Sequence, residues 1–247
     1  MSQFKFLSGN KLKIFACLTM LIDHIGAILL PNVLILRIIG RLSFPIFAFM
    51  ISEGAKYTKN KIKYLATIGI IGIIWQALLI AFLKDYHFNI LITFSLSIII
   101  IYALDFFKKS FFDKNCKIII KIATLLLFVA VALAPYFLQK IFSWFHYSYG
   151  FYGCMCAVFA SLPTLTNTDA PKWLKKFDTL YLRLLCMAVP LLIYSFKAGE
   201  YQIISLISLG ILAFYSEKRG KSSLKYFFYI FYPAHLIILY AIQFIIY

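Results

Sequence analysis

Apolar residues run in long blocks along this chain, and short polar clusters separate the blocks. Nine blocks are candidates for membrane-spanning helices, at residues 12–30, 34–55, 62–83, 89–107, 118–138, 146–163, 178–196, 201–216 and 225–246. A helix needs roughly 20 apolar residues to cross a bilayer, and most blocks approach that length. The pattern predicts an all-α fold: a polytopic bundle of about nine transmembrane helices, forming a single integral membrane domain over residues 1–247.

The first block permits two interpretations, a cleaved signal peptide or a first helix that is kept. It is longer than the apolar core of a signal peptide. It also ends in Leu29-Leu30-Pro31 rather than in the small residues of a cleavage site. We therefore expect an uncleaved first helix.

Basic residues test the number of spans, because lysine and arginine gather on the cytoplasmic side of a membrane protein. Of the 25 basic residues, 20 lie in the N-terminal segment, in every second connection after it, or at the adjoining helix ends. The opposite side holds only Lys84, Lys140 and Lys197. The sequence therefore predicts a multi-pass protein of the plasma membrane, with its N-terminus inside and its C-terminus outside.

The composition agrees with this class, since 63% of the residues are hydrophobic and only 14% are charged. A formal net charge of +16 would suggest nucleic-acid binding in a soluble protein. Here the charges lie between apolar blocks, where they set topology and contact anionic lipid headgroups. We expect the lipid bilayer as a partner and no nucleic acid. The five cysteines match no metal-site spacing, so we expect no bound metal.

The charged residues Asp23, Arg37 and Arg41 lie inside the first two blocks. Each would cost about 2.5–3.5 kcal/mol at the centre of a spanning helix, so they should face a protein interior or a wet cavity. His24 lies about 18 Å from the cytoplasmic start of its helix, at 1.5 Å per residue. The chain then turns at Pro31 and returns, which brings Asp23, His24 and both arginines to the outer half of one helical hairpin.

The hairpin cluster has a structural and a functional interpretation. In the structural one, Asp23 pairs with an arginine and His24 makes a helix contact. In the functional one, Asp23 neutralises one arginine, and the remaining positive charge of Arg37 or Arg41 suits an anionic group or a developing oxyanion. A neutral His24 beside it is what a general base for acyl transfer requires. We favour the functional interpretation because both arginines share the depth of His24.

Four further residues are candidates for a substrate site or cavity. Tyr232 and His235 lie in the last block. His235 is about 15 Å from the cytoplasmic start of this block at 1.5 Å per residue, so it is expected to line the same cavity. Glu53 ends the second block near Lys56, where an interfacial ion pair is the simpler interpretation. Asn89 lies near an outer helix end, where polar residues are common.

Five stretches resemble TraX-family membrane proteins: Leu18–Gly26, Arg37–Gly54, Asn89–Ser97, Tyr149–Gly153 and Tyr229–Leu236. The resemblance spans nearly the whole chain and is strongest in the first two helices and the last. It implies a membrane acetyltransferase, since TraX proteins are associated with acetylating the N-terminal amine of conjugative pilin. The family also distantly resembles the acyltransferase-3 proteins, which have a functional arginine separated by ten residues from a first-helix histidine, and an Arg-x-x-Arg pair.

Two pairs of residues compare with those acyltransferase-3 patterns. Lys13 and His24 have the first spacing, with lysine in place of arginine, which loses the bidentate fork of the guanidinium. Arg37 and Arg41 are one residue wider than the second pattern, although both spacings keep the pair on one helix face. A direct transfer of these roles therefore does not follow from spacing alone.

Our hypothesis from the sequence is transfer of an acetyl or short acyl group from a cytoplasmic acyl-CoA, most simply acetyl-CoA, without a bound cofactor. His24 is the general base, Asp23 arranges the arginines, and Arg37 and Arg41 hold an anionic part of the donor or the oxyanion. The acceptor is an amine or hydroxyl of an exported peptide or glycan, and a pilin-like peptide is one candidate. The alternatives are a transporter or flippase that uses these residues as a proton or anion path, and an accessory subunit without chemistry.

Overall fold

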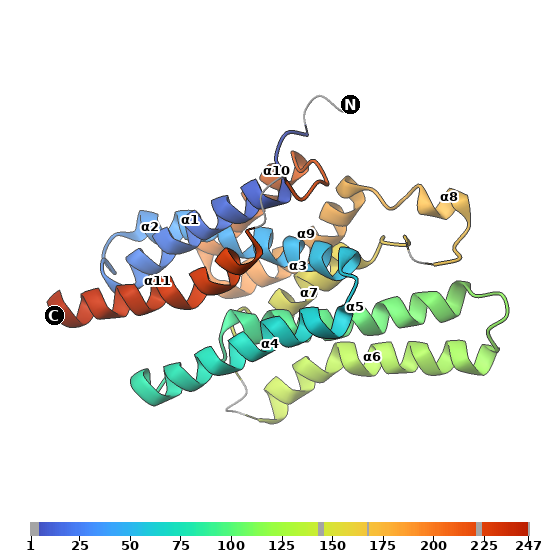
Figure 1. Cartoon of the computed structure of the whole chain (residues 1–247), viewed down its shortest axis with the longest axis horizontal. Coiled ribbons are helices and arrows are strands. Elements are labelled where there is room, and N and C mark those ends of the chain that lie inside the picture. Colours follow the sequence, from blue (N-terminus) through green and yellow to red (C-terminus); the bar gives the residue numbers. More distant parts are fainter. Residues whose placement is uncertain (1–4, 143–145, 167, 221–223, 247) are drawn as a thin grey trace. The chain divides into compact units, whose positions relative to one another are not determined.

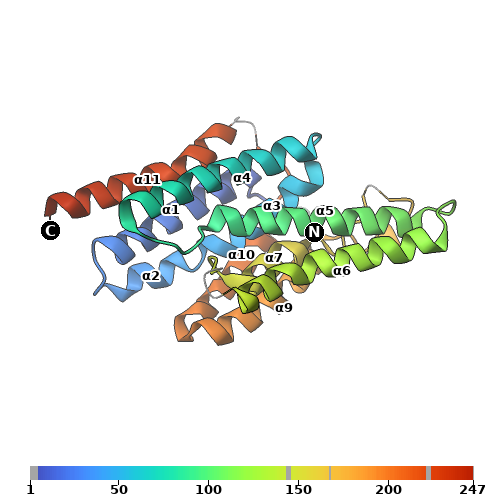
Figure 2. The same ribbon diagram turned by 90° about the horizontal axis from the view of Figure 1, so that it is seen from below.

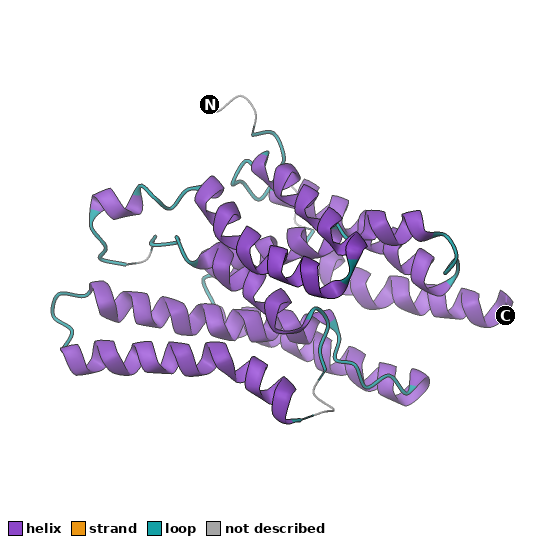
Figure 3. Cartoon of the chain, turned by 180° about the vertical axis from the view of Figure 1, so that it is seen from behind, coloured by secondary structure: helices purple, strands orange, loops and turns teal. Residues whose placement is uncertain are grey.

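The computed structural model describes residues 5–142, 146–166, 168–220 and 224–246, and no β-strand occurs in these ranges (Figures 1 and 3). The elements in order are α1 (Gly9–Ile28), α2 (Leu34–Gly40), α3 (Ser43–Tyr57), α4 (Lys61–Leu78), the π-helix η1 (Leu79–Leu83), α5 (Ile90–Phe112), α6 (Ile118–Ile141), α7 (Gly150–Ser161), α8 (Lys172–Lys175), α9 (Leu180–Ala198), the 3₁₀-helix η2 (Glu200–Leu206), α10 (Ile207–Ala213) and α11 (Lys225–Ile246). The predicted all-α class is therefore confirmed.

Six helical segments are long and apolar enough to cross a membrane: Leu34–Tyr57, Lys61–Leu83, Ile90–Phe112, Ile118–Ile141, Leu180–Ala198 and Phe227–Ile246. α1 is 20 residues long but carries Lys11, Lys13 and Asp23. α7 and the η2–α10 segment are apolar but shorter. The chain is thus a multi-pass membrane protein, while the number of nine spans and the N-in, C-out orientation stay predictions.

α6 shows why a bilayer is needed around these helices. Only 11% of its most apolar stretch is buried within the protein. Ile118 and Leu126, for example, are 72% and 63% exposed. A helix that is apolar all round and lacks protein neighbours on most sides is stable only in an apolar solvent, where its backbone bonds are satisfied within the helix.

The chain divides into two compact units, which we call the terminal unit and the central unit. The terminal unit contains the residues up to Met50 and those from Leu191 onward, and the central unit is Ile51–Pro190. The boundaries fall inside α3 and α9. The expected single membrane domain over residues 1–247 stays a prediction.

In the terminal unit, α1 lies between α2 and α11 (Figure 2). The Ser8 hydroxyl caps α1 by accepting a hydrogen bond from the Lys11 amide, as expected of serine at a helix start. The chain before α1 is held by the segment that follows α10, since the Leu7 amide donates to the Phe214 carbonyl at 3.1 Å. Residues far apart in sequence therefore form one folded unit.

The second predicted span, residues 34–55, is interrupted in the structure. α2 ends at Gly40 and α3 begins at Ser43, with a turn at Arg41 and Leu42. Pro45 explains the break, because it lacks the N–H that would otherwise donate to the Arg41 carbonyl. The Ser43 hydroxyl instead donates to the Gly40 carbonyl at 2.9 Å.

In the central unit, α5 packs against α4, α6 and α7 (Figure 1). Buried polar side chains join these helices: the Ser97 hydroxyl donates to the Cys154 carbonyl at 3.0 Å, and Thr93 donates to the Ser148 carbonyl at 2.8 Å. All five cysteines are free thiols. The unit is thus a helical bundle whose helices are joined by buried hydrogen bonds, as helices in a bilayer require.

Candidate functional site

α1 and α2 approach closely because glycines face the contact on both helices. A methyl group on Gly26 would lie 2.7 Å from the Leu36 Cβ, and one on Gly40 would overlap the Asp23 side chain. The lack of a side chain at these two positions lets the Asp23 carboxylate lie against the end of α2. Small residues at a helix contact are the usual way to bring two membrane helices together.

Asp23 forms hydrogen-bonded ion pairs with Arg37 of α2 and with Arg41 in the turn that follows α2. Its Oδ2 accepts from Arg37 Nη1 at 2.8 Å, and its Oδ1 accepts from Arg41 Nη2 at 2.9 Å. Arg37 also donates to the Asp23 carbonyl, and Arg41 Nε donates to the Arg37 carbonyl at 3.0 Å. The sequence predicted that Asp23 would neutralise one arginine, whereas one carboxylate bridges two guanidinium groups. One positive charge of this trio remains in excess.

The three side chains differ in how accessible they are. Asp23 is 13% exposed and Arg41 is 18% exposed, whereas Arg37 is 34% exposed. Arg37 is therefore the charge of the trio that an incoming group reaches most easily. Both arginines present donors in a planar fork, which suits carboxylate, phosphate or an oxyanion.

His24 follows Asp23 on α1 and bonds to the last helix. Its Nδ1 lies 2.8 Å from Nε2 of His235 on α11. The two rings are 4.9 Å apart between centroids and tilted by 34°. His235 is 5% exposed, and its Nδ1 lies 2.7 Å from the Phe231 carbonyl oxygen. The structure thus brings His235 to His24. The expectation that both line one cavity stays a prediction.

Aromatic residues of α11 enclose His235. The Phe231 ring stacks on it at 4.9 Å between centroids and 16° between planes, and Tyr232 contacts it edge-on at 6.0 Å. Tyr232 therefore lies beside the second histidine of the pair. Lys13 lies on the same side of α1, with its ammonium group 5.4 Å from the centroid of Phe228.

Gln202 on η2 is a member of the cluster that the sequence reasoning missed. Its Oε1 accepts from Arg41 Nη1 at 3.4 Å, and the side chain is 3% exposed. Because an arginine can only donate, this contact orients the amide and leaves Nε2 as a buried donor without a partner among the described residues. In the sequence, Gln202 could be noticed only as a polar residue within the short apolar block at 201–216.

A cavity of about 440 Å³ opens at the turn that joins α1 to α2. It is lined by residues 28–33 and by Gln243 of α11. Gln243 donates to the Ile28 carbonyl at 3.2 Å, which joins α11 to the end of α1. Ile28 lies one helical turn, about 6 Å, beyond His24 on α1. The cavity therefore lies at the end of α1, one helical turn beyond His24, and its lining residues belong to the α1–α2 turn and α11 rather than to the histidine and arginine cluster.

A family model for the TraX protein matches residues 8–243, which is nearly the whole chain. The chain belongs to the TraX family. Of its relatives, a probable fimbrial assembly protein of Dichelobacter nodosus, serogroup H1, is 25% identical over 247 aligned residues, with 94% of each chain covered. An uncharacterized protein of Rickettsia prowazekii (strain Madrid E) is 34% identical over 116 residues, which cover 45% of this chain and 44% of that protein. No solved structure matches the chain significantly.

Glu53 belongs to the central unit, whereas the cluster belongs to the terminal unit. It pairs with Arg183 of α9, which is 1% exposed and also donates to the Ser52 hydroxyl and the Ala160 carbonyl. Lys56, the expected partner of Glu53, instead bonds Asp178 at 3.3 Å. The predicted interfacial pair with Lys56 is thus replaced by a buried pair with Arg183. Arg183 was assigned from sequence only to the cytoplasmic charge pattern.

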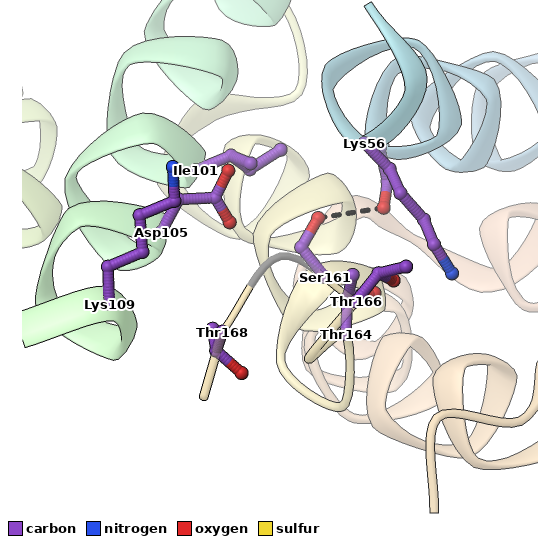
Figure 4. A pocket seen from close by; sticks show the side chains of 9 residues that line it. Lys56, Ile101, Asp105, Lys109, Ser161, Thr164, Thr166 and Thr168 are labelled. Carbon is purple, nitrogen blue, oxygen red and sulfur yellow. Dashed lines mark hydrogen bonds between the residues drawn. The ribbon is translucent and has the colours of Figure 1, made fainter. Parts of the chain in front are cut away.

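A small cavity adjoins that network (Figure 4). Its volume is about 20 Å³, and Lys56, Asp105, Ser161 and Thr164 are among its lining residues. The Ser161 hydroxyl shares a hydrogen bond of 2.7 Å with the hydroxyl of Ser52. This volume holds about one water molecule, so the network of the central unit has no room for an acyl donor.

Asn89 has a structural place in the same unit. Its side chain caps α5 by accepting from the Leu91 amide at 3.0 Å and donates to the Gly72 carbonyl at 2.8 Å. Its backbone amide donates to Gln76 Oε1 at 2.9 Å. These bonds join α4 to the start of α5 and satisfy the buried Asn89 side chain, so its burial needs no ligand.

Within the described ranges, no three His, Cys, Asp or Glu side chains are grouped closely enough to hold a metal.

Proposed function

We propose that this chain is a membrane acyltransferase that moves an acetyl, or other short acyl, group from acyl-CoA to an amine or hydroxyl of an exported substrate. The observation that carries the proposal is the hydrogen-bonded pair of His24 and His235 in the unit that also holds the Asp23–Arg37–Arg41 trio. Acyl transfer needs a base near a site that stabilises negative charge, and this unit offers both.

Family membership supports the reaction and suggests the acceptor. The TraX family is linked to pilin acetylation, and the Dichelobacter nodosus relative is named a probable fimbrial assembly protein. A pilin-like peptide with a free N-terminal amine is therefore our first candidate acceptor, and an exported glycan is the second.

The proposed reaction begins when His24 Nε2 removes a proton from the acceptor amine or hydroxyl as its nitrogen or oxygen attacks the thioester carbonyl. A C–N or C–O bond forms, and the carbonyl oxygen becomes an oxyanion beside the guanidinium groups of Arg37 and Arg41. The C–S bond then breaks, and His24 returns its proton to the departing sulfur. The products are the amide or ester and free CoA thiol, so atoms and charge balance.

We place the entry of the acceptor at the cavity of the α1–α2 turn, which lies one helical turn beyond His24. Its volume of about 440 Å³ lies within the range of small-molecule sites, which are roughly 300–1,000 Å³. A peptide terminus or a sugar hydroxyl entering there would approach the histidine from the end of α1. In the predicted orientation this end faces outward, which matches an exported acceptor.

Mass spectrometry of surface peptides and glycans tests the proposal in cells. We compare cells that carry the wild-type protein, no copy of it, or the His24→Gln variant, with His87→Gln as a matched histidine variant because His87 is exposed in a central-unit loop. We expect acetylated species only with the wild-type protein and His87→Gln. Equal acetylation in all four strains contradicts the proposal, and proton-coupled solute uptake by purified protein without consumption of acyl-CoA would favour the transporter alternative.

A further inference from the structure

The hydrogen bonds of His235 specify which nitrogen of His24 carries the proton. Each neutral imidazole has one N–H donor and one bare nitrogen that accepts, and the bond made by one nitrogen sets the state of the other. His235 Nδ1 lies 2.7 Å from the Phe231 carbonyl oxygen, which can only accept. His235 Nδ1 is therefore protonated, and in the neutral ring its Nε2 is bare.

The bare Nε2 of His235 then acts on His24. It lies 2.8 Å from His24 Nδ1, and two bare nitrogens would repel each other at that distance. His24 Nδ1 must therefore carry the hydrogen, which leaves the lone pair on His24 Nε2. The hydrogens point in one direction along the chain, from His24 through His235 to the Phe231 carbonyl.

Asp23 is the obvious alternative for this orienting role, since it precedes His24 in sequence. Its two carboxylate oxygens instead accept from Arg37 and Arg41, at 2.8 and 2.9 Å. The His24 ring bonds to α11 rather than to this carboxylate. The two functions are thus divided: Asp23 holds the arginines, and His235 holds the histidine.

We infer that His235 is a positioning residue that fixes His24 in the Nδ1–H tautomer and so leaves Nε2 free to accept the acceptor's proton. This inference rests on the proposed function for its chemical purpose, although the tautomer itself does not. When His24 takes up a proton at Nε2, its Nδ1–H bond to His235 stabilises the resulting imidazolium, as a carboxylate does in a hydrolase triad. The stacked Phe231 and the 5% exposure of His235 keep the orienting ring in place.

Nitrogen NMR of the full-length protein in lipid bilayers, with ¹⁵N-labelled histidine, tests the inference directly. The chain has 4 histidines, and the other two, His87 and His146, are exposed. A double His87→Gln, His146→Gln variant leaves only the signals of the paired rings. At a pH where both are neutral, we expect both Nδ1 atoms protonated, both Nε2 atoms bare, and a coupling between His24 Nδ1 and His235 Nε2. A protonated His24 Nε2 in this spectrum overturns the inference.

Two substitutions of His235 then test the consequence for activity. His235→Leu removes the acceptor, and His235→Gln keeps a side-chain oxygen that can accept from His24 Nδ1. We expect His235→Leu to let His24 populate the Nε2–H tautomer and to lower kcat about 10- to 100-fold, by analogy with the loss of a partner that orients a metal-ligating histidine. KM for acetyl-CoA should change by less than about twofold, and His235→Gln should recover part of kcat.

The failures of the two proposals are distinguishable. If His24 has the Nδ1–H tautomer but the protein transfers no acyl group, the role of His235 in fixing the tautomer stands and the proposed acyltransferase function is wrong. If acyl transfer depends on His24 but His24 has the Nε2–H tautomer, the acyltransferase function stands and the inferred role of His235 is wrong. The same conclusion follows if His235→Leu leaves the tautomer unchanged. The spectrum with both histidines present needs no change in the pair, so instability of His235→Leu does not prevent the test.

Discussion

His24 Nδ1 lies 2.8 Å from His235 Nε2, although 211 residues separate them in the sequence. This contact joins the first helix to the last and places two titratable rings in one hydrogen-bonded chain. Because α1 also carries Asp23, the same helix links the histidine pair to Arg37 of α2 and to Arg41 in the turn after it. The features from which we propose acyl transfer therefore depend on the packing of α1 between α2 and α11.

Asp23→Asn tests the energetic role of the bridging carboxylate. The change leaves two guanidinium groups without their counter-charge, and we expect a loss of about 2–3 kcal/mol in stability, below the range for a fully buried pair because Arg37 is 34% exposed. Thermal unfolding in detergent measures this loss. The double variant Asp23→Asn, Arg37→Gln removes one of the unpaired charges and should be more stable than Asp23→Asn alone. A double variant less stable than the single one would contradict the charge account.

Gly40→Ala tests the close approach of α1 and α2. The added methyl group would overlap Asp23, so we expect lower stability and reduced acyl transfer. Gly210→Ala in α10 is the matched control, since no atom lies within 4 Å of the added methyl group and alanine is the better helix former. Unfolding temperature and transfer rate are measured for both. Equal behaviour of the two variants would show that the contact at Gly40 is not required.

Long stretches of apolar sequence predicted helices well, whereas breaks and ends of helices were harder to predict. Long apolar blocks predicted the long helices, and the turn at Pro31 was enough to place Asp23 near Arg37 and Arg41. The break at Arg41 was not predicted, because the apolar block continues through it and only Pro45 marks it. α7, with 12 residues, is shorter than the predicted span at 146–163, since backbone geometry rather than hydropathy sets helix ends.

Contacts between distant segments were less accessible to sequence reasoning. Helix depth suggested that His235 lines the cavity of His24 but did not indicate a hydrogen bond between them. Glu53 was assigned to the nearby Lys56, whereas its partner Arg183 lies 130 residues away. Gln202 was overlooked because one neutral polar residue in an apolar block has no distinctive pattern. In each case the partner is decided by helix packing, which a single sequence does not specify.

Gln202→Glu tests the excess positive charge at Arg37 and Arg41. A carboxylate in place of the amide would lie beside Arg41 and balance the second guanidinium, so we expect KM for acetyl-CoA to rise about tenfold, or ~1.4 kcal/mol. Gln202→Leu adds no charge and removes a buried donor that has no partner among the described residues, so its KM should stay within about twofold of wild type. Steady-state kinetics at saturating acceptor compare the two. A similar KM for both variants would argue against an electrostatic role for the cluster.

Thiol labelling tests the predicted orientation. Cys116 lies between α5 and α6, in a connection assigned to the cytoplasm, and Lys84 lies between α4 and α5, in a connection assigned to the outside. In intact cells, a membrane-impermeant maleimide should label Lys84→Cys in a Cys116→Ser background. Cys116 itself should react only after the membrane is permeabilised. The reverse pattern would contradict the charge-based topology and the outward access route to His24.

Transfer of label from acetyl-CoA by the purified protein in lipid bilayers tests the central claim most directly. The donor carries the label in its acetyl group, and a synthetic peptide with a free N-terminal amine is the acceptor, with serine in the peptide to report hydroxyl transfer. We predict one CoA thiol released for each acetyl group transferred, and a rate at least about 100-fold lower for His24→Gln, as expected on removing a general base. Transfer by His24→Gln at the wild-type rate would contradict the account.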